Sequence, residues 1–323
     1  MVQPPAPDEV RELSRSLDRW LVETPVLRAM PLEDRLGAGA RVHAKLEFLQ
    51  RTGTFKARGA LSVLRGLDAA QRAAGVTAVS AGNHAIAVAF AARAMGASAK
   101  VVMLRHANPA RMDRCRGYGA EVVLADDVHS AFEVAQRIRD DEGRHFVHPF
   151  EGPDIARGTA SVGVEICEQV PGVEAVLVPV GGGGLCAGVA SVVKQLNPSC
   201  AVYGIEPAGA DSMHRSVEAG APASIDRVTT IADSLGAPYA LPYSFELCRR
   251  YVDDWVRVDD DQLRDSMRYL FRNMRIAVEP ACAATTAALR GPLAERLAGR
   301  NVVLIMCGSN IDWHTYARHV AFG

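Results

Sequence analysis

The chain has 323 residues, of which 49% are apolar and 23% are charged, and its formal net charge is −1. This balance argues against a nucleic-acid partner, which would require a basic face, and no apolar run is long enough to span a membrane. The opening residues, Met1 to Pro7, lack the basic and apolar stretches of a signal peptide, and the seven cysteines form no Cys-x-x-Cys pair. We therefore expect a reduced, cytoplasmic protein.

Hydrophobic periodicity predicts an amphipathic helix over residues 8–21, an extended segment at 24–27 and a first strand at 42–48. Further strands are expected at 77–79, 100–104, 121–124, 175–180, 201–205, 254–258 and 301–306. Helices are expected at 85–95, 110–118, 128–140, 159–169, 185–196, 260–275 and 280–290. Strands that alternate with helices of this length predict parallel sheets covered by helices, an α/β fold.

Lys56 lies at a turn between the first predicted strand and a helical pattern that begins at Ala57. Gly53 allows a tight turn, and the threonines on either side of it can cap the helix. A lysine near the positive end of a helix dipole is disfavoured as a cation, so its pKa is expected to be depressed. Lys56 is therefore a candidate for a nucleophilic, imine-forming amine, whereas an ordinary solvated lysine is the competing interpretation.

The segment Gly53–Ala60 resembles the lysine motif Ser/Thr-Phe-Lys-x-Arg-Gly-Ala of the pyridoxal-phosphate-dependent threonine/serine dehydratase and serine racemase group. This family has the tryptophan-synthase-β-like fold, also called fold type II. The resemblance implies a small domain at 75–148 inserted into a large cofactor-binding domain formed by 1–74 and 149–323. It also implies a homo-oligomer, most simply a dimer, and the chain ends before the place where some threonine dehydratases carry a regulatory domain.

A second motif, Ser80–Ala85, follows a predicted strand and opens a helix, which suits the binding of a carboxylate by backbone N–H groups. The alternative is an ordinary asparagine-capped turn. The motif resembles the Ser-x-Gly-Asn-His segment of the family, where the asparagine meets the cofactor and the loop holds the substrate carboxylate. Two residues depart from the family pattern: Ala81 replaces the serine that acts as second acid/base in serine racemase, and Ile86 replaces a glutamine.

Four consecutive glycines, Gly181–Gly184, follow a predicted strand and precede a helix that begins near Leu185. Successive backbone N–H groups can converge there with the helix dipole, which predicts an anion site. The spacing also fits a loose dinucleotide fingerprint, with Glu206 at the end of the next strand, so a nicotinamide-dependent dehydrogenase is a competing hypothesis. The resemblance instead assigns these glycines to the phosphate of pyridoxal phosphate.

Cys307 follows the last predicted strand and matches the family position that faces the pyridine nitrogen of the cofactor. A thiol is a weak donor and no strong acid, so it would leave that nitrogen largely unprotonated. The ring would then be a poorer electron sink, which favours prompt loss of a β-leaving group over a long-lived carbanion. A buried cysteine that serves only as a small apolar residue is the alternative.

The resemblance implies further site residues. The expected cofactor contacts are Phe55, Lys56, Asn83, Gly181, Gly182, Gly183, Gly184, Leu185, Glu279 and Cys307. The expected substrate contacts are Thr52, Ser80, Ala81, Gly82, Asn83, His84 and Ser234. Glu206 and Ala210 match the start of a cation site in serine racemase, although Ser212 stands where an aspartate ligand is expected there; a divalent or monovalent cation is therefore a further hypothesis.

The resemblance predicts an ammonia-lyase that removes the β-hydroxyl group from a 3-hydroxy amino acid such as L-threonine or L-serine. Lys56 carries the cofactor, is displaced by the substrate and then takes the Cα proton as general base. The products are a 2-oxo acid and ammonia. Three alternatives stay open at this point: a 3-hydroxyaspartate dehydratase, a serine-type racemase and, from another class, the dehydrogenase.

Overall fold

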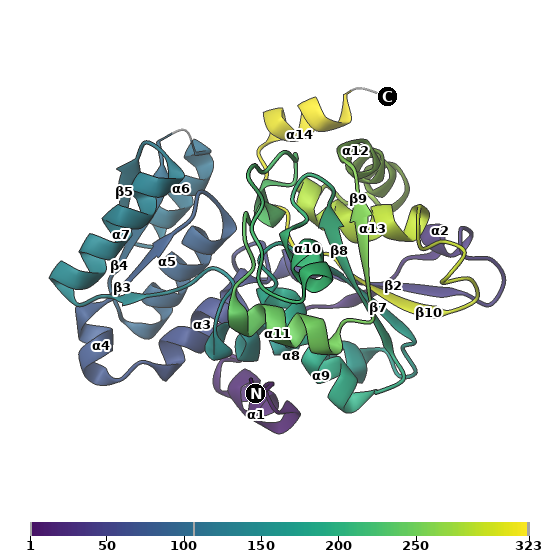
Figure 1. Cartoon of the computed structure of the whole chain (residues 1–323), viewed down its shortest axis with the longest axis horizontal. Helices are drawn as coiled ribbons and strands as arrows, with labels where there is room; N and C mark the ends of the chain where they lie inside the picture. The colour runs from purple at the N-terminus through teal and green to yellow at the C-terminus, as the bar shows by residue number, and fades with distance from the viewer. Residues whose placement is uncertain (1, 106, 322–323) are drawn as a thin grey trace.

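The fold is built around two sheets, which the computed structural model shows side by side for residues 2–105 and 107–321 (Figure 1). The larger sheet has six strands in the order β1-β2-β10-β7-β8-β9. Its short edge strand β1 runs antiparallel to β2, and the other neighbours are parallel. The strands are β1 (Val26–Arg28), β2 (Arg41–Lys45), β7 (Ala175–Pro179), β8 (Ala201–Pro207), β9 (Asp254–Val258) and β10 (Asn301–Ile305).

The smaller sheet has four parallel strands in the order β5-β4-β3-β6. They are β3 (Val76–Val79), β4 (Ala99–Leu104), β5 (Glu121–Ala125) and β6 (His145–Phe146). All four strands come from the chain between β2 and β7 of the larger sheet. The smaller sheet is therefore an insertion within the larger one, on the left in Figure 1.

The helices connect these strands in the right order for parallel sheets. They are α1 (Pro7–Ser16), α2 (Met30–Glu33), η1 (Glu47–Leu49), α3 (Lys56–Gly66), α4 (Ala69–Ala74), α5 (Asn83–Met95), α6 (Pro109–Gly117), α7 (Val128–Glu142), α8 (Pro153–Gln169), α9 (Gly184–Leu196), α10 (Ser212–Ala219), η2 (Asp233–Leu235), α11 (Pro242–Tyr251), α12 (Asp260–Tyr269), η3 (Leu270–Met274), α13 (Pro280–Arg290) and α14 (Trp313–Val320).

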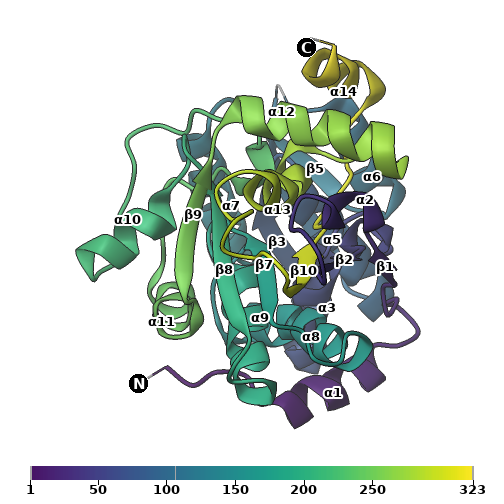
Figure 2. The same ribbon diagram turned by 90° about the vertical axis from the view of Figure 1, so that its right-hand side faces the viewer.

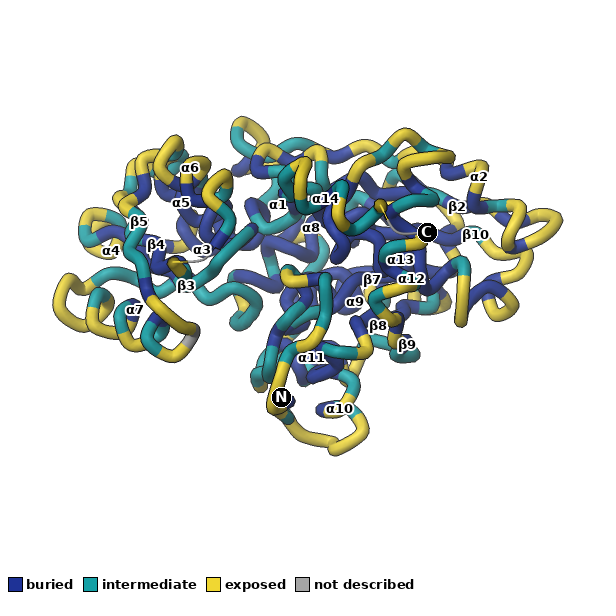
Figure 3. The backbone as a smooth tube through the Cα atoms, turned by 90° about the horizontal axis from the view of Figure 1, so that it is seen from above, coloured by how far each residue is buried: buried dark blue, intermediate teal, exposed yellow. Residues whose placement is uncertain are grey.

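Both faces of the larger sheet are covered by helices. Figure 1 places α12 and α13 above it and α8, α9 and α11 below it, and Figure 2 shows the same strands from the side. Central strand β7 is buried along its whole length, as expected for a parallel sheet that has helices on both faces. The buried backbone gathers around α9, α13 and β7 in Figure 3, whereas exposed segments lie at the periphery.

The smaller sheet has its own apolar layers. On one face, α5 contributes Ile86 and Val88 to a cluster with Val101 of β4. On the other face, Ala131 and Ala135 of α7 pack against Val102 and Ala125. Small residues on α7 let this helix approach the strands closely.

Helix α3 joins the two halves of the molecule. Its Leu61 and Leu64 belong to the apolar cluster of the smaller sheet, while its other side packs against α8 of the larger one. Gly158 of α8 allows this contact, because a Cβ atom there would lie 2.4 Å from the carbonyl oxygen of Arg58. The helix that begins at Lys56 is therefore fixed by both sheets.

A cluster of paired charges is buried behind α3, and we call Lys45, Glu47, Arg58 and Glu165 the paired-charge cluster. Arg58 donates through Nε and Nη2 to both oxygens of Glu47, each at 2.8 Å, and through Nη1 to Glu165 at 2.6 Å. Lys45 Nζ donates to the other oxygen of Glu165. Burial alone lowers the pKa of Arg58, but Glu47 and Glu165 outweigh it and raise that pKa. The cluster therefore keeps its charges by pairing them.

The predicted α/β class with parallel sheets is confirmed, and the strand at 254–258 is reproduced to the residue. Several boundaries differ: the helix expected over 8–21 ends at Ser16, and the helix expected at 159–169 begins at Pro153. The extended segment at 24–27 contains an antiparallel edge strand, and the strand expected to reach residue 48 ends at Lys45 before the turn η1. The helix expected over 260–275 ends at Tyr269 and continues as the π-helical segment η3. The two-residue strand β6 was not predicted because it is too short to show alternation.

Candidate active site

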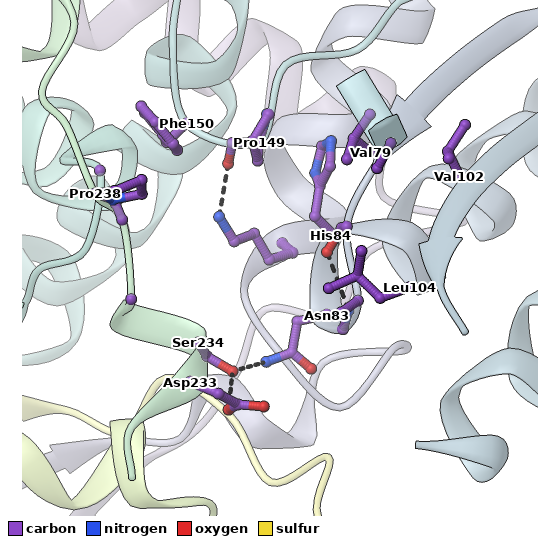
Figure 4. Close-up of a pocket in the computed structure, with 18 of the residues that line it drawn as sticks. Val79, Asn83, His84, Val102, Leu104, Pro149, Phe150, Asp233, Ser234 and Pro238 are labelled. Carbon is purple, nitrogen blue, oxygen red and sulfur yellow. Dashed lines mark hydrogen bonds between the residues drawn. The ribbon is translucent and has the colours of Figure 1, made fainter. Parts of the chain in front are cut away.

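A cavity of about 280 Å³, shown in Figure 4, opens between the two sheets, and Lys56 is among the residues that line it. The larger half contributes Gly182 and the segment that includes Asp233, Ser234 and Tyr239. The smaller half contributes residues from the ends of β3 and β4 and from α5, α6 and α7. A smaller adjoining hollow is lined by Lys56, the four glycines, Glu279 and Cys307. The predicted motifs, far apart in sequence, thus meet at one place.

Lys56 is the first residue of α3, as its sequence context predicts. Its backbone N–H donates to Thr54 Oγ1 at 3.3 Å, so this threonine helps to start the helix. The Nζ atom donates to the carbonyl oxygen of Pro149 at 2.6 Å. Burial lowers the pKa of Lys56 to about 8, against the opposing influence of Cys307 and Glu279. About a tenth of this amine is therefore neutral and nucleophilic at pH 7, far more than for a lysine of ordinary pKa.

The loop Ser80–Gly82 runs from the end of β3 to the first turn of α5. Ser80 Oγ accepts the N–H of Gly82 at 3.1 Å, which holds the loop in a tight bend. The first N–H groups of a helix have no acceptor within it, so those of α5 can receive an anion at the cavity wall. The predicted residues Ser80, Ala81, Gly82, Asn83 and His84 all line the cavity.

The four glycines form a narrow turn that ends as the N-terminus of α9. Gly183 has φ +91°, a left-handed conformation that favours glycine, and a Cβ atom there would lie 2.5 Å from Met213 Cε. A Cβ atom on Gly182 would lie 2.2 Å from the Phe150 ring. The turn therefore admits only glycine at these two positions, and it presents backbone N–H groups at a helix N-terminus. These residues, together with the nearby lysine, fit the phosphate and carbonyl groups of pyridoxal phosphate.

A buried carboxyl group, Glu279, lies beside Lys56 and Asn83. Its Oε1 accepts from Asn83 Nδ2 at 2.8 Å, and its Oε2 accepts from the backbone N–H of Asn310 at 3.1 Å. Burial raises the pKa of Glu279 to about 7, with a further contribution from Asp233. Asn83 Nδ2 also donates to Ser234 Oγ at 3.1 Å, which brings three predicted site residues into one hydrogen-bonded group.

Cys307 lines the smaller hollow at the end of β10, as predicted. A hydrogen bond with the Cys282 thiol, together with burial, raises the pKa of Cys307 well above its ordinary value. The thiol is therefore neutral. A neutral thiol can offer only weak hydrogen bonding to a ring nitrogen.

Two histidines near the cavity are also neutral. Burial lowers the pKa of His84 to about 3 and that of His148 to about 4, and the proximity of Lys56 acts in the same direction. His84 Nε2 lies 2.8 Å from the carbonyl oxygen of Val147, so this nitrogen carries the ring proton. His148 Nδ1 accepts the N–H groups of Phe150 and Glu151, which fixes the return of the chain to the larger sheet.

One predicted substrate contact lies elsewhere. Thr52 is fully buried and, within the described chain, lines neither hollow; its carbonyl oxygen instead accepts from Asn310 Nδ2 at 2.8 Å. Sequence reasoning missed Arg111, Phe132 and Phe150, which line the cavity, and Asn310, which donates to Asn83 beside it. Of these, only Asn310 carried a signal, because it closes the segment that begins at Cys307.

The cation hypothesis for Glu206 and Ala210 stays a prediction. The Glu206 carboxyl accepts the N–H groups of Met213 and His214, at 3.0 and 2.7 Å, and burial raises its pKa to about 8. Ala210 is buried next to this helix start. Within residues 2–105 and 107–321, no three histidine, cysteine or acidic side chains gather in a way that could hold a metal ion.

Comparison with known proteins identifies the family. The model of the pyridoxal-phosphate dependent enzyme family matches residues 18–308. The chain is 53% identical to a phenylserine dehydratase from Ralstonia pickettii over 96% of this chain and 95% of that one. It is 35% identical to an L-threonine ammonia-lyase from Thermotoga maritima, over 94% and 75% of the two chains. The solved structure of maize serine racemase superposes with a TM-score of 0.92 and 31% identity, over 99% and 98% of the chains.

The chain therefore belongs to the pyridoxal-phosphate dependent enzymes, and its fold is that of the tryptophan-synthase-β-like group. The predicted cofactor, pyridoxal phosphate, and the predicted reaction class, an ammonia-lyase elimination from a 3-hydroxy amino acid, are confirmed. The comparisons decide against the dinucleotide interpretation of the four glycines.

Proposed function

We propose that this lyase acts on 3-hydroxy amino acids that carry an aryl group on the β-carbon, with phenylserine as the type substrate. The observation that carries the proposal is the apolar wall of the cavity. The relative from Ralstonia pickettii is a phenylserine dehydratase, which supports the same substrate class.

The apolar wall belongs to the smaller sheet and borders the same cavity as Lys56. It consists of Val79 on β3, Val102 and Leu104 on β4, and Ala131 and Phe132 on α7. Val79, Val102 and Leu104 appear on the right of Figure 4, beyond His84. Val79, Leu104 and Phe132 are partly exposed there, whereas Val102 and Ala131 are fully buried behind them. A methyl or hydrogen substituent, as in threonine or serine, would leave the exposed part of this wall uncovered, whereas a phenyl ring would bury it.

Aromatic side chains also border the side of the cavity nearest the larger sheet. Phe150 lies over Gly182, and its ring centroid is 6.0 Å from that of Tyr239. The His148 ring meets Phe150 edge to face at a centroid distance of 4.7 Å. An aryl substrate would thus find aromatic partners of suitable geometry on both sides of Lys56.

The cavity offers little for a second carboxylate, as in 3-hydroxyaspartate. The guanidinium that lines it, Arg111, donates through Nη1 to Asp233 at 2.8 Å. Its Nε and Nη2 donate to the carbonyl oxygen of Asn310 at 3.2 and 2.9 Å. These bonds use three of the five N–H donors of the guanidinium, and the Asp233 carboxylate offsets its charge, so Arg111 is a weakened partner for a substrate carboxylate.

The residues of the chain divide the work of elimination. The loop Ser80–Gly82 and the start of α5 hold the substrate carboxylate, and the glycines hold the cofactor phosphate. Neutral Lys56 takes the Cα proton, which its pKa of about 8 permits. When bound, pyridoxal phosphate supplies a ring that accepts the electron pair left at Cα. Phe150 and the apolar wall exclude water while the β-hydroxyl group leaves.

The reaction balances as the loss of water followed by hydrolysis. The Cα proton and the β-hydroxyl group leave together as water, and the resulting enamine takes up water to release ammonia. Phenylserine therefore yields phenylpyruvate and ammonia. No oxidant or reductant is required.

The proposal is tested by comparing kcat/KM for L-threo-phenylserine, L-threonine, L-serine and L-threo-3-hydroxyaspartate with the cofactor-loaded protein. Burial of a phenyl group should favour phenylserine over threonine by about 10- to 100-fold. Phe132→Ala should lower kcat/KM for phenylserine about tenfold and leave that for threonine nearly unchanged. Phe271→Ala, the same change at a half-exposed position outside the cavity, serves as the control.

Two results would contradict the proposal. If threonine or serine were the better substrate, the apolar wall would not select the substrate. If Phe132→Ala lowered activity equally on all four amino acids, Phe132 would support the fold and not the aryl group.

We also infer the finer features of organisation that the family suggests. Two domains, 75–148 and the flanking segments, are supported by the separate apolar clusters of the two sheets. A homodimer is supported by large exposed apolar side chains, including Met30 and Trp313, which are 62% and 70% exposed. A cytoplasmic location is supported by the seven cysteines, all of which are free thiols. The described helices include none with the length and apolarity needed to cross a membrane.

A further inference from the structure

Asn310 stands at a meeting point of three parts of the molecule. Its Nδ2 donates to Thr52 O and to Asn83 Oδ1, each at 2.8 Å, and its backbone N–H donates to Glu279 Oε2. Thr52 precedes Lys56 in the turn that starts α3, and Asn83 starts α5. Asn310 thus connects the segment before the reactive lysine to the loop on the substrate side. Its side chain is 92% buried, with 8% exposed, so water competes weakly for these bonds.

Helix α6 of the smaller sheet reaches across to Asn310. Arg111 donates through Nε and Nη2 to the carbonyl oxygen of Asn310, and Arg114 donates to the side-chain Oδ1 of Asn310. Arg111 also reaches Asp233 in η2 with Nη1, so one guanidinium spans two segments of the larger half. Next to it, Asn108 donates to Asp312 at 2.7 Å. We call Arg111, Asp233 and Asn310 the α6 clamp.

The α6 clamp lies against the loop that is expected to hold the substrate carboxylate. A Cβ atom on Gly82 would lie 3.0 Å from Arg111 Nη1, so the guanidinium packs directly behind the loop. Only 12% of the Arg111 side chain is exposed, and it lines the cavity. The same group therefore supports the loop from behind and ties it to the larger half.

We propose that Arg111 is a positioning residue for the elimination, because its fork to Asn310 and Asp233 holds the Ser80–Asn83 loop in register with Lys56. The choice of phenylserine as the test substrate rests on the proposed function, whereas the contacts of Arg111 do not depend on it. Arg111 acts through Asn310, which orients Asn83 and Glu279. A loop that is held in place before the substrate arrives binds it with less loss of entropy.

Lysine cannot replace Arg111 in this role. The rigid fork of a guanidinium places three N–H groups on two acceptors at once, whereas a lysine amine is a single flexible point. Arg111→Lys keeps the positive charge and loses the fork. This variant therefore separates positioning from simple electrostatic attraction of the substrate carboxylate.

The experiment compares Arg111→Gln, Arg111→Lys and Asp233→Asn with Arg116→Gln in the cofactor-loaded full chain. Arg116 lies on the same helix, pairs with Asp113 at the surface and is 53% exposed, so it is a matched control. For Arg111→Gln we expect KM for phenylserine to rise at least about tenfold, with a smaller change in kcat. Arg111→Lys should fall between this variant and the wild type. Asp233→Asn removes the charge from one bond of three but keeps an oxygen acceptor, so it should have the smallest effect.

Hydrogen exchange provides a measurement that does not depend on turnover. The Asn310 N–H, which donates to Glu279, and the N–H groups of residues 80–84 should exchange about tenfold faster in Arg111→Gln than in Arg116→Gln. Combining Arg111→Gln with Asp233→Asn should add nothing further, because both changes break the same clamp.

Three results would overturn the inference. Arg111→Gln could match Arg116→Gln in both KM and exchange, or it could lower kcat alone with exchange unchanged. The effects of Arg111→Gln and Asp233→Asn could also prove additive. If Arg111→Gln fails to fold, Arg111→Lys and Asp233→Asn still decide by the same two measurements. If no 3-hydroxy amino acid is turned over, the proposed function fails, while the exchange data still test the clamp.

Discussion

Two polar clusters lie on different sides of helix α3. They differ in how the surroundings shift the pKa values of their members. The paired-charge cluster is centred on Arg58. The second cluster, which we call the cavity cluster, consists of Lys56, His84 and Glu279. Side chains two positions apart on a helix do not face each other, so α3 directs Arg58 into one cluster and Lys56 into the other. Most members of both clusters are buried, whereas Lys56 and Glu165 are partly exposed.

In the paired-charge cluster, opposite charges meet at hydrogen-bonding distance and stabilise the ionised forms of Glu47 and Arg58, whereas burial still lowers the pKa of Lys45. Burial raises the pKa of Glu47, but Arg58 outweighs it and leaves that pKa below its ordinary value. In the cavity cluster, burial prevails. It lowers the pKa of Lys56 to about 8 and raises that of Glu279 to about 7. Groups that change protonation near neutral pH are suited to proton transfer, whereas permanently paired charges are suited to holding a helix in place.

The largest expected effect comes from breaking the paired-charge cluster. Arg58→Met would leave Glu47 and Glu165 without their main partner, and removing one member of a buried pair costs about 3–5 kcal/mol of unfolding free energy. Arg65→Met, on the exposed side of the same helix, is the matched control and should change stability little. Urea unfolding of the cofactor-free protein measures both. A loss below about 1 kcal/mol for Arg58→Met would remove the contrast between the clusters.

A smaller effect should appear in the pH dependence of stability. The folded-state pKa of Glu279 is raised, so the folded protein holds this proton more tightly than the unfolded chain. Stability contributed by this group is present below pH 4.5 and is lost as pH rises through about 7, by on the order of 3 kcal/mol at most.

Glu279→Gln should flatten this decline in the cofactor-free protein, whereas Glu12→Gln at the surface should not. The measurement is a series of unfolding curves between pH 4.5 and 8, compared with the wild type. Glu206 contributes in the same direction because its pKa is also raised, so the difference between variant and wild type is the informative quantity. A parallel pair of curves would show that Glu279 ionises normally in the folded state.

The smallest expected effect concerns stereochemistry. Racemisation needs a proton donor on the face opposite Lys56, and the methyl group of Ala81, which lines the cavity, cannot supply one. The wild type should therefore give 2-oxo acid and ammonia with little D-amino acid. Ala81→Ser should raise racemisation about tenfold or more above that background, measured by chiral chromatography beside an ammonia assay. Racemate that forms as fast as ammonia in the wild type would reveal a second acid.

Much of the site could be predicted because its backbone chemistry is local. A strand, a glycine turn and a helix start are readable in sequence, and this is how Lys56, Asn83 and Gly181–Gly184 were found. The edge strand β1 and the strand β6 could not be predicted in this way. Each is too short for periodicity, and each is defined by hydrogen bonds to strands distant in sequence.

The site residues that were not predicted were missed for a different reason. Arg111 and Phe132 lie on helices of the smaller sheet, and nothing in their local sequence distinguishes them from other surface-helix residues. Their importance comes from how the two sheets face each other, which spacing along the chain does not encode. Ala81 and Cys307, by contrast, could be identified from the sequence, because each replaces the polar residue found at that position in some members of the family.

The connections between the two sheets have a mechanical consequence. The chain leaves the larger half through α3, which begins at Lys56, and returns through the segment that contains Pro149. The bond from Lys56 Nζ to Pro149 O joins these two connections. The lysine amine therefore marks the point where the chain crosses between the two halves, and a shift of one half relative to the other would displace this nitrogen least.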